Sequence, residues 1–447
     1  MTLERFGQAT TLKRVAAGAS AFSSHEKLSV CDSSDKLIIV AKSIDYVIFL
    51  KLTTRGFVAT LGLHQIVCWG TLTYGVTVFA PAMATRAGVP VAAIMAAYSA
   101  GLLFNAAVAP ACTRWVMRGN ALRGGVVGLA TGVLACLVLA FAWHVSLVFA
   151  GFALAGAAMA LTQYDFAWLC VRLFHPHNAR RVVTGVTLFG ALASSIMWPI
   201  AHQLNVRFGL VTGWLGLATI MALVGGGCLW LFTRAAVPND SPAGEEASVA
   251  PPAQSHPPLD ATSTRYVVLG LTLVSSVGAG LAANLPLLLS KFQASPGAIA
   301  GVLSLFGIGQ LLARGLDFLS SKRTGLGVTL QAAVAACAVF WLLLVGLAWA
   351  GESFLMLALA VLLMGASNGL LTILRGATPQ LLFWGEQFTH VSAQLASAGS
   401  VARAILPLAV ALALESAMPI WAVAVLCSAT LFVGAWWVWQ HARHALR

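Results

Sequence analysis

Charge is scarce in this sequence. Only 9% of its 447 residues are Asp, Glu, Lys or Arg, whereas 59% are hydrophobic and the mean hydropathy is +0.87. A soluble domain carries about 25% charged residues. The shortage excludes an ordinary soluble fold and indicates a chain that crosses a bilayer several times.

Acidic residues are the scarcer of the two signs, with 14 Asp and Glu against 26 Lys and Arg, which gives a net charge of +12. In a soluble protein this excess would suggest nucleic acid. In a membrane protein it is explained by basic cytoplasmic loops that fix the orientation of the chain. We therefore expect no nucleic-acid partner and no obligate protein partner; the expected partners are the lipid bilayer, a small-molecule substrate and protons.

Catalytic and metal-binding motifs are also missing. The eight cysteines are scattered without a C-x-x-C pair, so neither a disulfide framework nor a thiolate metal site is expected. The sequence contains no H-E-x-x-H, no P-loop and no G-x-G-x-x-G that opens a βαβ unit. Gly365–Gly369 matches G-x-S-x-G, but it lies in an apolar helical segment and not at a strand–turn–helix junction. We expect no enzyme, no metal and no cofactor.

Long apolar runs, by contrast, are abundant from Phe57 onward, and each is close to the roughly 20 residues that a membrane-spanning helix needs. The twelve runs lie at about 57–80, 89–109, 123–143, 146–170, 182–204, 209–232, 266–289, 297–319, 327–349, 353–374, 389–413 and 417–440. The sequence predicts an all-α polytopic membrane protein with 12 transmembrane helices in two six-helix bundles.

The two halves of the chain repeat one pattern. A shift of 208 residues relates Leu61-Gly62-Leu63 to Leu269-Gly270-Leu271, and Gly101 to Gly309. Such self-similarity indicates an internal repeat. We expect one bundle at 57–232 and the second at 265–440.

Three polar segments flank these bundles. Residues 1–56 are expected to form a basic, disordered tail or, alternatively, an amphipathic segment on the membrane surface, because their apolar run is short and no cleavable signal pattern is present. Residues 233–264 are rich in Pro, Ser, Ala and acid, which is typical of a flexible linker. Residues 441–447 form a short tail.

The Lys and Arg of the predicted loops alternate between a rich side and a poor side. The poor side holds only Arg86, Arg207 and Lys291. The rich side holds Arg114, Arg118, Arg123, Arg172, Arg180, Arg181, Arg234, Arg265, Lys322, Arg323, Arg375, Arg443 and Arg447. The bias predicts that the linker and both termini are cytoplasmic.

The run Gly297–Arg323 carries two charges near its end. Arg314 and Asp317 are three residues apart, so on a helix they share a face and can pair. Arg314 lies roughly 12 Å short of Lys322, which places it in the hydrocarbon or just under its boundary. An ionisable residue there faces a bundle interior or a wet cavity by default. The alternative is that Arg314 extends to the headgroups and binds nothing.

Asp165 is the clearest acid within a predicted membrane segment. A lone carboxylate in a low-dielectric setting can take up and release a proton near neutrality, which makes Asp165 a candidate for proton coupling, with Asp317 as a second candidate. The alternative is an acid that holds an arginine on a neighbouring helix and never titrates.

Arg403 lies in the middle of the eleventh segment, where it needs an acid, carbonyl groups or an anionic ligand. Arg314 and Arg403 together favour an anionic substrate, unless Asp165 and Asp317 neutralise them internally. Further polar side chains are candidates to line a central cavity or, alternatively, to bond neighbouring helices; these are Gln65, Trp69, Tyr74, Tyr164, Asn284, Gln310 and Gln394.

Residues 57–440 resemble the major facilitator superfamily in their twelve segments, two repeats and basic loops. The stretch Ala109–Arg118 is similar to that family's G-x-x-x-D-R-x-G-R-R signature: Arg114 and Arg118 match, but Thr113 stands where the family has Asp. Thr187–Pro199 and Gly369–Phe383 resemble a bacterial branch near the monocarboxylate and oxalate porters. The resemblance implies a bacterial inner-membrane protein in which Arg375 is a substrate-site residue, although Arg375 also fits an ordinary cytoplasmic loop charge.

These observations predict a secondary active transporter that moves a small organic anion, such as a monocarboxylate, by proton-coupled alternating access. The alternative is a proton-driven exporter of drugs or metalloids. A membrane sensor or scaffold without transport is the third hypothesis, and it predicts no solute-dependent flux.

Overall fold

The fold is seen in a computed structural model, which describes residues 53–235, 259–292, 296–321, 323–350, 353–416 and 418–446. Most of the expected N-terminal tail (1–52), most of the linker (236–258), Lys322 and Arg447 lie outside the described residues. Within the described residues every regular element is a helix.

The first half of the described chain contains helices in three conformations, with short π-helical turns inside or between longer α-helices. In order they are α3 (Thr54–Trp69), η2 (Gly70–Tyr74), α4 (Gly75–Ala87), α5 (Val91–Trp115), η3 (Val116–Asn120), α6 (Ala121–Ala140), α7 (Val145–Ala160), α8 (Tyr164–Phe174), η4 (Pro176–Asn178), α9 (Ala179–Ala191), α10 (Ala193–Ile220), η5 (Met221–Gly225) and α11 (Gly226–Ala235).

The second half is more regular, with six long helices. They are α12 (Ala261–Ser290), α13 (Pro296–Ser320), α14 (Leu326–Ala350), α15 (Phe354–Leu382), α16 (Gly385–Glu415) and α17 (Ile420–Leu446). Each holds 25 to 31 residues, which is enough to cross a bilayer.

Ten helical runs in the described part of the chain are long and apolar enough to cross a membrane. Two of them, Val91–Ala140 and Pro176–Phe232, have 50 and 57 residues, about twice what one crossing needs. Each is broken at a glycine with positive φ, at 85° for Gly119 and 79° for Gly209, a conformation that glycine adopts without steric cost. Divided at these breaks, the described residues supply twelve apolar helical segments.

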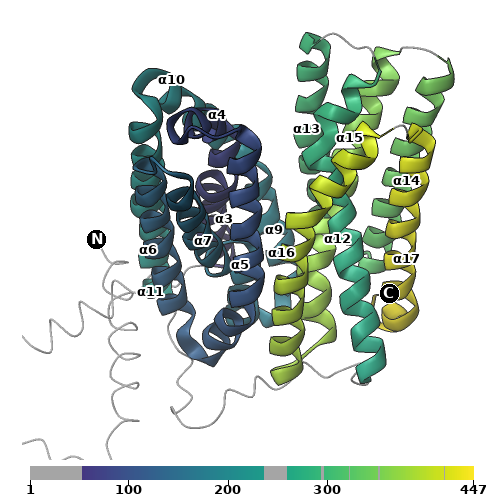
Figure 1. Ribbon diagram of the computed structural model, residues 1–447. Coiled ribbons are helices and arrows are strands. Elements are labelled where there is room, and N and C mark those ends of the chain that lie inside the picture. Colours follow the sequence, from purple (N-terminus) through teal and green to yellow (C-terminus); the bar gives the residue numbers. More distant parts are fainter. Residues whose placement is uncertain are drawn as a thin grey trace, which may run out of the picture. The chain divides into compact units, whose positions relative to one another are not determined.

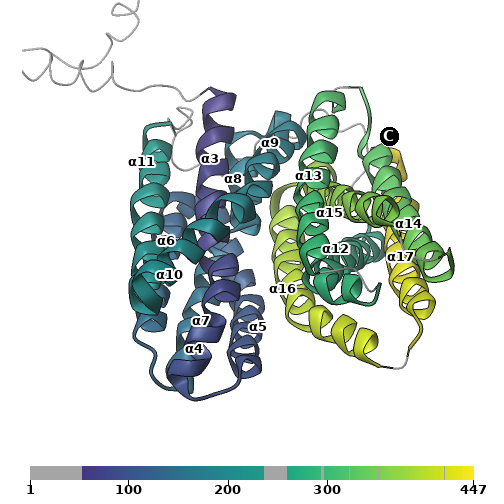
Figure 2. The ribbon, with the colours of Figure 1, turned by 90° about the horizontal axis from the view of Figure 1, so that it is seen from above.

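The helices gather in two groups that follow the chain, as the colours of Figures 1 and 2 show. One group holds α3 to α11 and the other holds α12 to α17. The groups meet where α5 packs against α16 and where α9 packs against α13 and α15. This is the two-bundle arrangement that the sequence predicts.

Glycines bring two helices of each bundle into backbone contact. A Cβ on Gly101 of α5 would overlap the carbonyl of Phe152 on α7, and a Cβ on Gly309 of α13 would overlap the carbonyl of Leu362 on α15. Gly101 and Gly309 are the residues that the 208-residue shift relates. The internal repeat is therefore a repeat of helix packing as well as of sequence.

Large apolar side chains cover the outside of both bundles. Leu223, Leu319 and Trp349 are exposed to 71%, 79% and 84%. Helices that are apolar on all sides are stable only when lipid or other helices surround them. The exposed apolar surface therefore fits a membrane-embedded protein.

Candidate functional site

Arg172, at the end of α8, inserts into the second bundle. Its guanidinium donates to the carbonyl oxygens of Gln380 (3.1 Å) and Phe383 (2.7 Å), where α15 ends. The same group lies 3.7 Å from the ring centroid of Trp384 and 4.6 Å from that of Phe388. Because a helix C-terminus leaves carbonyl groups without intrahelical donors, it is a natural site for an arginine.

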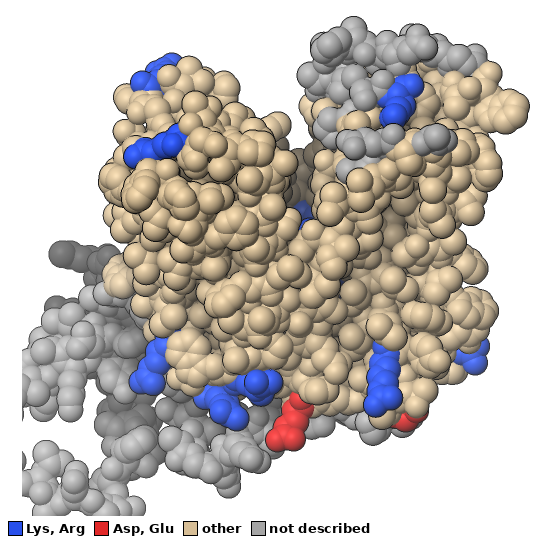
Figure 3. All heavy atoms as spheres, viewed as in Figure 1, with Lys and Arg blue, Asp and Glu red and all other residues tan. Residues whose placement is uncertain are grey.

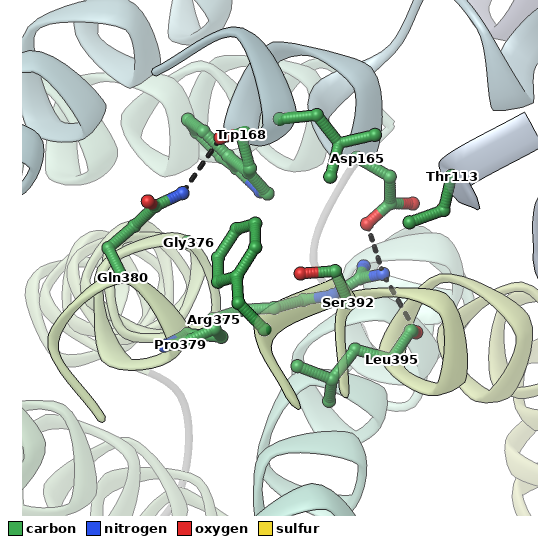
Figure 4. A pocket seen from close by; sticks show the side chains of 11 residues that line it. Thr113, Asp165, Trp168, Arg375, Gly376, Pro379, Gln380, Ser392 and Leu395 are labelled. Carbon is green, nitrogen blue, oxygen red and sulfur yellow. Dashed lines mark hydrogen bonds and ion pairs between the residues drawn. The ribbon is translucent and has the colours of Figure 1, made fainter. Parts of the chain in front are cut away.

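An ion pair joins the two bundles beside Arg172. Arg375 on α15 donates from Nη2 to Oδ1 of Asp165 on α8 at 2.8 Å, and also to the carbonyl of Leu395 at 3.1 Å (Figure 4). Asp165 is therefore not a lone carboxylate, because it holds an arginine of the other bundle. Its exchange of a proton stays a prediction. Arg375 is correspondingly no simple loop charge.

The cavity around this ion pair is small. Its volume is about 20 Å³, enough for a water molecule and too little for an organic solute. Thr113 lines it together with Asp165 and Arg375 (Figure 4). Thr113 stands where the G-x-x-x-D-R-x-G-R-R signature has Asp. At this place Asp165 supplies a carboxylate from another helix.

A second ion pair links α9 to α13. Arg180 donates to Asp317 at 2.9 Å, and Asp317 also accepts from the hydroxyls of Thr184 (3.2 Å) and Thr329 (2.6 Å). Asp317 is therefore buried with a full set of donors. The predicted pairing of Asp317 with Arg314 is wrong, because the carboxylate meets α9 and α14 instead of its own helix neighbour.

Arg314 is buried and crosses the interface to carbonyl groups. Its Nη1 donates to the carbonyl of Thr187 on α9 at 2.5 Å, and its Nε makes a longer contact with the carbonyl of Gly369 on α15 at 3.4 Å. In the described residues no carboxylate lies within ion-pair distance of Arg314. The guanidinium does not reach a headgroup region, so the alternative that Arg314 simply extends to the surface is also wrong.

Arg403, on α16, is half-buried and likewise has no carboxylate partner among the described residues. It donates to Ser400 Oγ at 3.0 Å and, more weakly, to Gln163 Oε1 on the first bundle at 3.4 Å. Its Cζ lies 5.7 Å from the ring of Trp69, and its Nε has no hydrogen-bond partner. Asp165 and Asp317 form their direct ion pairs with Arg375 and Arg180, and Asp165 is a longer-range electrostatic neighbour of Arg403.

Aromatic side chains of the first bundle surround the two arginines. Tyr164 lies between Trp69 and Trp168, with ring centroids 5.1 Å and 5.0 Å away, and is parallel to Trp168 within 8°. Tyr74 and Tyr164 are electrostatic neighbours of Arg314. We call Trp69, Tyr74, Tyr98 and Tyr164 the aromatic wall; all four are half-buried.

The two bundles are separated by a hollow at one end, and a basic side chain is visible at its base (Figure 3). The contacts of Arg172, Asp165 and Arg180 join them at the other end, which carries the α8–α9 and α13–α14 connections. We call these the open end and the closed end. Lys and Arg gather at the closed end in this view.

Comparison with solved structures identifies the fold. The human organic anion transporter MFSD10 matches with a TM-score of 0.60 and 15% identity over 86% of this chain and 98% of that one. FucP, a major facilitator superfamily transporter in its outward conformation, matches with 0.61 and 15% over 85% and 97%. The chain has the major facilitator fold.

A third match is a bacterial homologue of the iron transporter ferroportin in an outward-facing state, with a TM-score of 0.60 and 14% identity over 86% of this chain and 99% of that one. At such identities the likeness shows the fold alone. No protein-family model and no curated protein matches the sequence.

Within the major facilitator fold, most of the predicted site residues come together at the bundle interface. Arg314, Arg403, Trp69, Tyr74, Tyr164, Asp165 and Arg375 form it, with Gln65 behind them donating to the carbonyl of Thr162 at 2.8 Å. Gln310 lies against Gly369, close to the carbonyl that Arg314 contacts.

Two predicted residues lie apart from this group. Asn284 donates to the carbonyls of Gly280 and Pro407 at 2.9 and 2.8 Å, so its amide joins helices, which was the alternative considered for it. Gln394 is exposed and bonds to His390 one turn away at 3.0 Å.

Sequence reasoning missed the role of Arg172, which it counted as a loop charge. A signal was available: Arg172 and Gln380 are 208 residues apart, the repeat shift itself. Gln380 in turn donates to the carbonyl of Trp168 at 2.7 Å, and Trp168 packs where a Cβ on Gly376, 208 residues later, would lie. Repeat-related residues therefore meet each other at the closed end.

Gly399 offers a way to disturb the Asp165–Arg375 pair without altering either partner. A Cβ at this position of α16 would lie 2.5 Å from Arg375 Nη2. Since alanine favours helix by about 1 kcal/mol over glycine, Gly399→Ala should leave α16 intact and displace only the arginine. We expect faster labelling of a cysteine at Ser392, beside the ion pair, from the closed end. Unchanged labelling would show that the pair does not hold that end shut.

Proposed function

We propose that this protein is a secondary active transporter that moves a small organic anion by proton-coupled alternating access. The two bundles rock about a site between them, which the hollow reaches from the open end. The protein would reside in the bacterial inner membrane with the basic closed end and both termini in the cytoplasm, so the structure corresponds to an outward-facing carrier.

The observation that supports an anion is the lack of counter-ions. Arg314 and Arg403 lie inside membrane-spanning helices at the bundle interface, and in the described residues neither has a carboxylate partner. A buried charge without a partner is costly, and an anionic solute would offset that cost. Arg403 is half-buried, whereas Arg314 is only 2% exposed, so Arg403 is the more accessible of the two.

The proposed coupling group is Asp165. Its ion pair with Arg375 joins the bundles at the closed end and must break for that end to open. Protonation would remove the charge that holds Arg375. Asp317 is a weaker candidate, because three donors satisfy it and its side chain is only 4% exposed.

A proton-driven exporter of drugs or metalloids is the second candidate. The half-buried aromatic wall would suit an apolar cation as well as an anion, since cations also bind to aromatic faces. In that case the two arginines would serve only to hold the bundles together, as Arg314 does through Thr187.

The test is thermal unfolding of the purified protein against small carboxylates, cationic drugs and metalloid oxyacids, followed by counterflow in proteoliposomes with each hit. A ligand stabilises the state that it binds by mass action, so a carboxylate should raise the melting temperature with concentration. Hits confined to drugs or metalloids would instead favour the exporter.

Arg403→Gln should weaken carboxylate binding by about ten- to a hundredfold, because a hydrogen bond to a charged group contributes about 1.5–3 kcal/mol. Arg323→Gln, the same substitution at an exposed arginine of the α13–α14 connection, is the matched control and should bind normally. Equal affinity in the two variants would remove Arg403 from the binding site.

A further inference from the structure

Tyrosine is rare in this chain, with five residues in 447, yet three of the five lie in the aromatic wall. Tyr98 is an electrostatic neighbour of Arg403, as Tyr74 and Tyr164 are of Arg314. These rings pack against the hydrophobic core on one side and lie beside the two arginines on the other.

The same place holds two hydrogen-bond donors without acceptors. Nε of Arg403 and Nε1 of Trp69 are both enclosed and unpartnered. The Arg403 Cζ lies 5.7 Å from the centroid of the Trp69 ring, so the two unpartnered donors belong to neighbouring side chains. Enclosed donors without acceptors are costly, and a carboxylate would satisfy them together.

Among the described arginines that lie beside the aromatic wall, only Arg403 has neither a carboxylate partner nor two carbonyl acceptors. Arg375 is bound to Asp165, Arg180 to Asp317, and Arg314 is buried against two carbonyl groups. Arg172 lies between Trp384 and Phe388 at the closed end. Arg403 is half-buried, and its bonds go to a hydroxyl and, weakly, to an amide oxygen.

We infer that the solute is an aromatic monocarboxylate, with its carboxylate on Arg403 and Trp69 and its ring against the aromatic wall. This inference rests on the proposed function and names the substrate class of the same site. The other arginines that adjoin the wall are already bound, Arg375 to Asp165 and Arg314 to two carbonyl groups, so a second carboxylate would be buried without a partner, which is strongly unfavourable. A planar ring would gain aromatic contacts with this wall that a saturated ring of equal size cannot make.

The experiment measures binding of four probes to the purified full-length protein: benzoate, cyclohexanecarboxylate, phthalate and benzamide. Benzoate is the expected ligand, and cyclohexanecarboxylate is its saturated counterpart. Phthalate is a dianion, and benzamide is a neutral aromatic ring. We expect benzoate to bind about three- to tenfold more tightly than cyclohexanecarboxylate, the range that one or two aromatic contacts supply. Phthalate and benzamide should bind at least tenfold more weakly than benzoate.

Two variants of Trp69 separate the ring from its N–H group. Trp69→Leu should weaken both carboxylates, because it removes the donor, and should lower the preference for benzoate over cyclohexanecarboxylate, because it removes one ring of the wall. Trp69→Phe keeps a ring and removes the donor, so it should keep the preference and weaken both carboxylates alike. Trp143→Leu, at an exposed tryptophan between α6 and α7, controls for the loss of an indole elsewhere.

The outcomes distinguish this inference from the proposed function. If both monocarboxylates bind equally, or the dianion binds best, the inference is wrong while the anion transporter stands. If none of the three carboxylates binds, the proposed function fails as well. Carboxylate affinity and benzoate preference that both stay unchanged in Trp69→Leu would also overturn the inference, because Trp69 would contact neither the carboxylate nor the ring.

Discussion

Replacing Asp165 with Asn should abolish proton-driven accumulation of the solute and leave solute exchange intact. Asparagine has nearly the size of aspartate and can still accept the hydrogen bond from Arg375, but its amide does not take up or release a proton near neutral pH. The Asp165 and Arg375 side chains are 18% and 17% exposed, so water can deliver protons to the pair. The measurement is uptake into proteoliposomes with and without a pH gradient, beside counterflow without one.

Asp317→Asn is the matched control for this result. Its carboxylate accepts from Arg180, Thr184 and Thr329 and is almost fully enclosed, so its removal leaves buried donors unsatisfied. We expect Asp317→Asn to lower the melting temperature and to keep gradient-driven uptake in the fraction that folds. If Asp165→Asn still accumulates solute against a gradient, Asp165 is not the proton carrier. If only Asp317→Asn loses this accumulation, Asp317 is the proton carrier.

Arg172→Ala should favour the conformation in which the two bundles separate at the closed end. We expect the equilibrium constant for this opening to rise by about a hundredfold or more. The variant loses two charge-assisted hydrogen bonds, each worth about 1.5 kcal/mol or more. It also loses the contacts with Trp384 and Phe388, which contribute further. Because Arg172 has no carboxylate partner in the described residues, this shift should be nearly independent of salt.

The shift can be measured by labelling a cysteine at Ser392 with a membrane-impermeant maleimide added on the side of the closed end. The parent protein without the added cysteine reports the background from native thiols. Arg172→Lys keeps the charge but lacks the planar group that lies over the two rings and reaches two carbonyls, so it should open the closed end to an intermediate degree. Labelling of Arg172→Ala at the wild-type rate would mean that Arg172 does not contribute to closure.

The sequence could predict the membrane segments because lipid imposes one requirement on each of them, about 20 apolar residues whose backbone groups are satisfied internally. The repeat was equally visible, and Gly101 and Gly309 show its physical basis, since both allow a helix backbone to approach its neighbour. Both properties are local or periodic, so they can be read along the chain.

The partners of the charged residues could not be predicted in the same way. Asp165 and Arg375 are 210 residues apart, and Arg180 and Asp317 are 137 apart. Proximity along a helix suggested Arg314 for Asp317, but three donors from α9 and α14 satisfy that carboxylate better than one neighbour on its own helix. Which charge is left unpaired depends on how the two bundles pack against each other, and this packing cannot be read directly from the sequence.

The unpaired charge of Arg403 has an electrical consequence for a carrier. In alternating access the site is connected first to one solution and then to the other, so its charge experiences the membrane potential, about 2.3 kcal/mol per elementary charge per 100 mV. With a negative interior, the empty positive site is drawn toward the cytoplasmic connection. A bound monoanion cancels that charge, so the loaded carrier would cross without electrical work and the voltage would act on the return of the empty one.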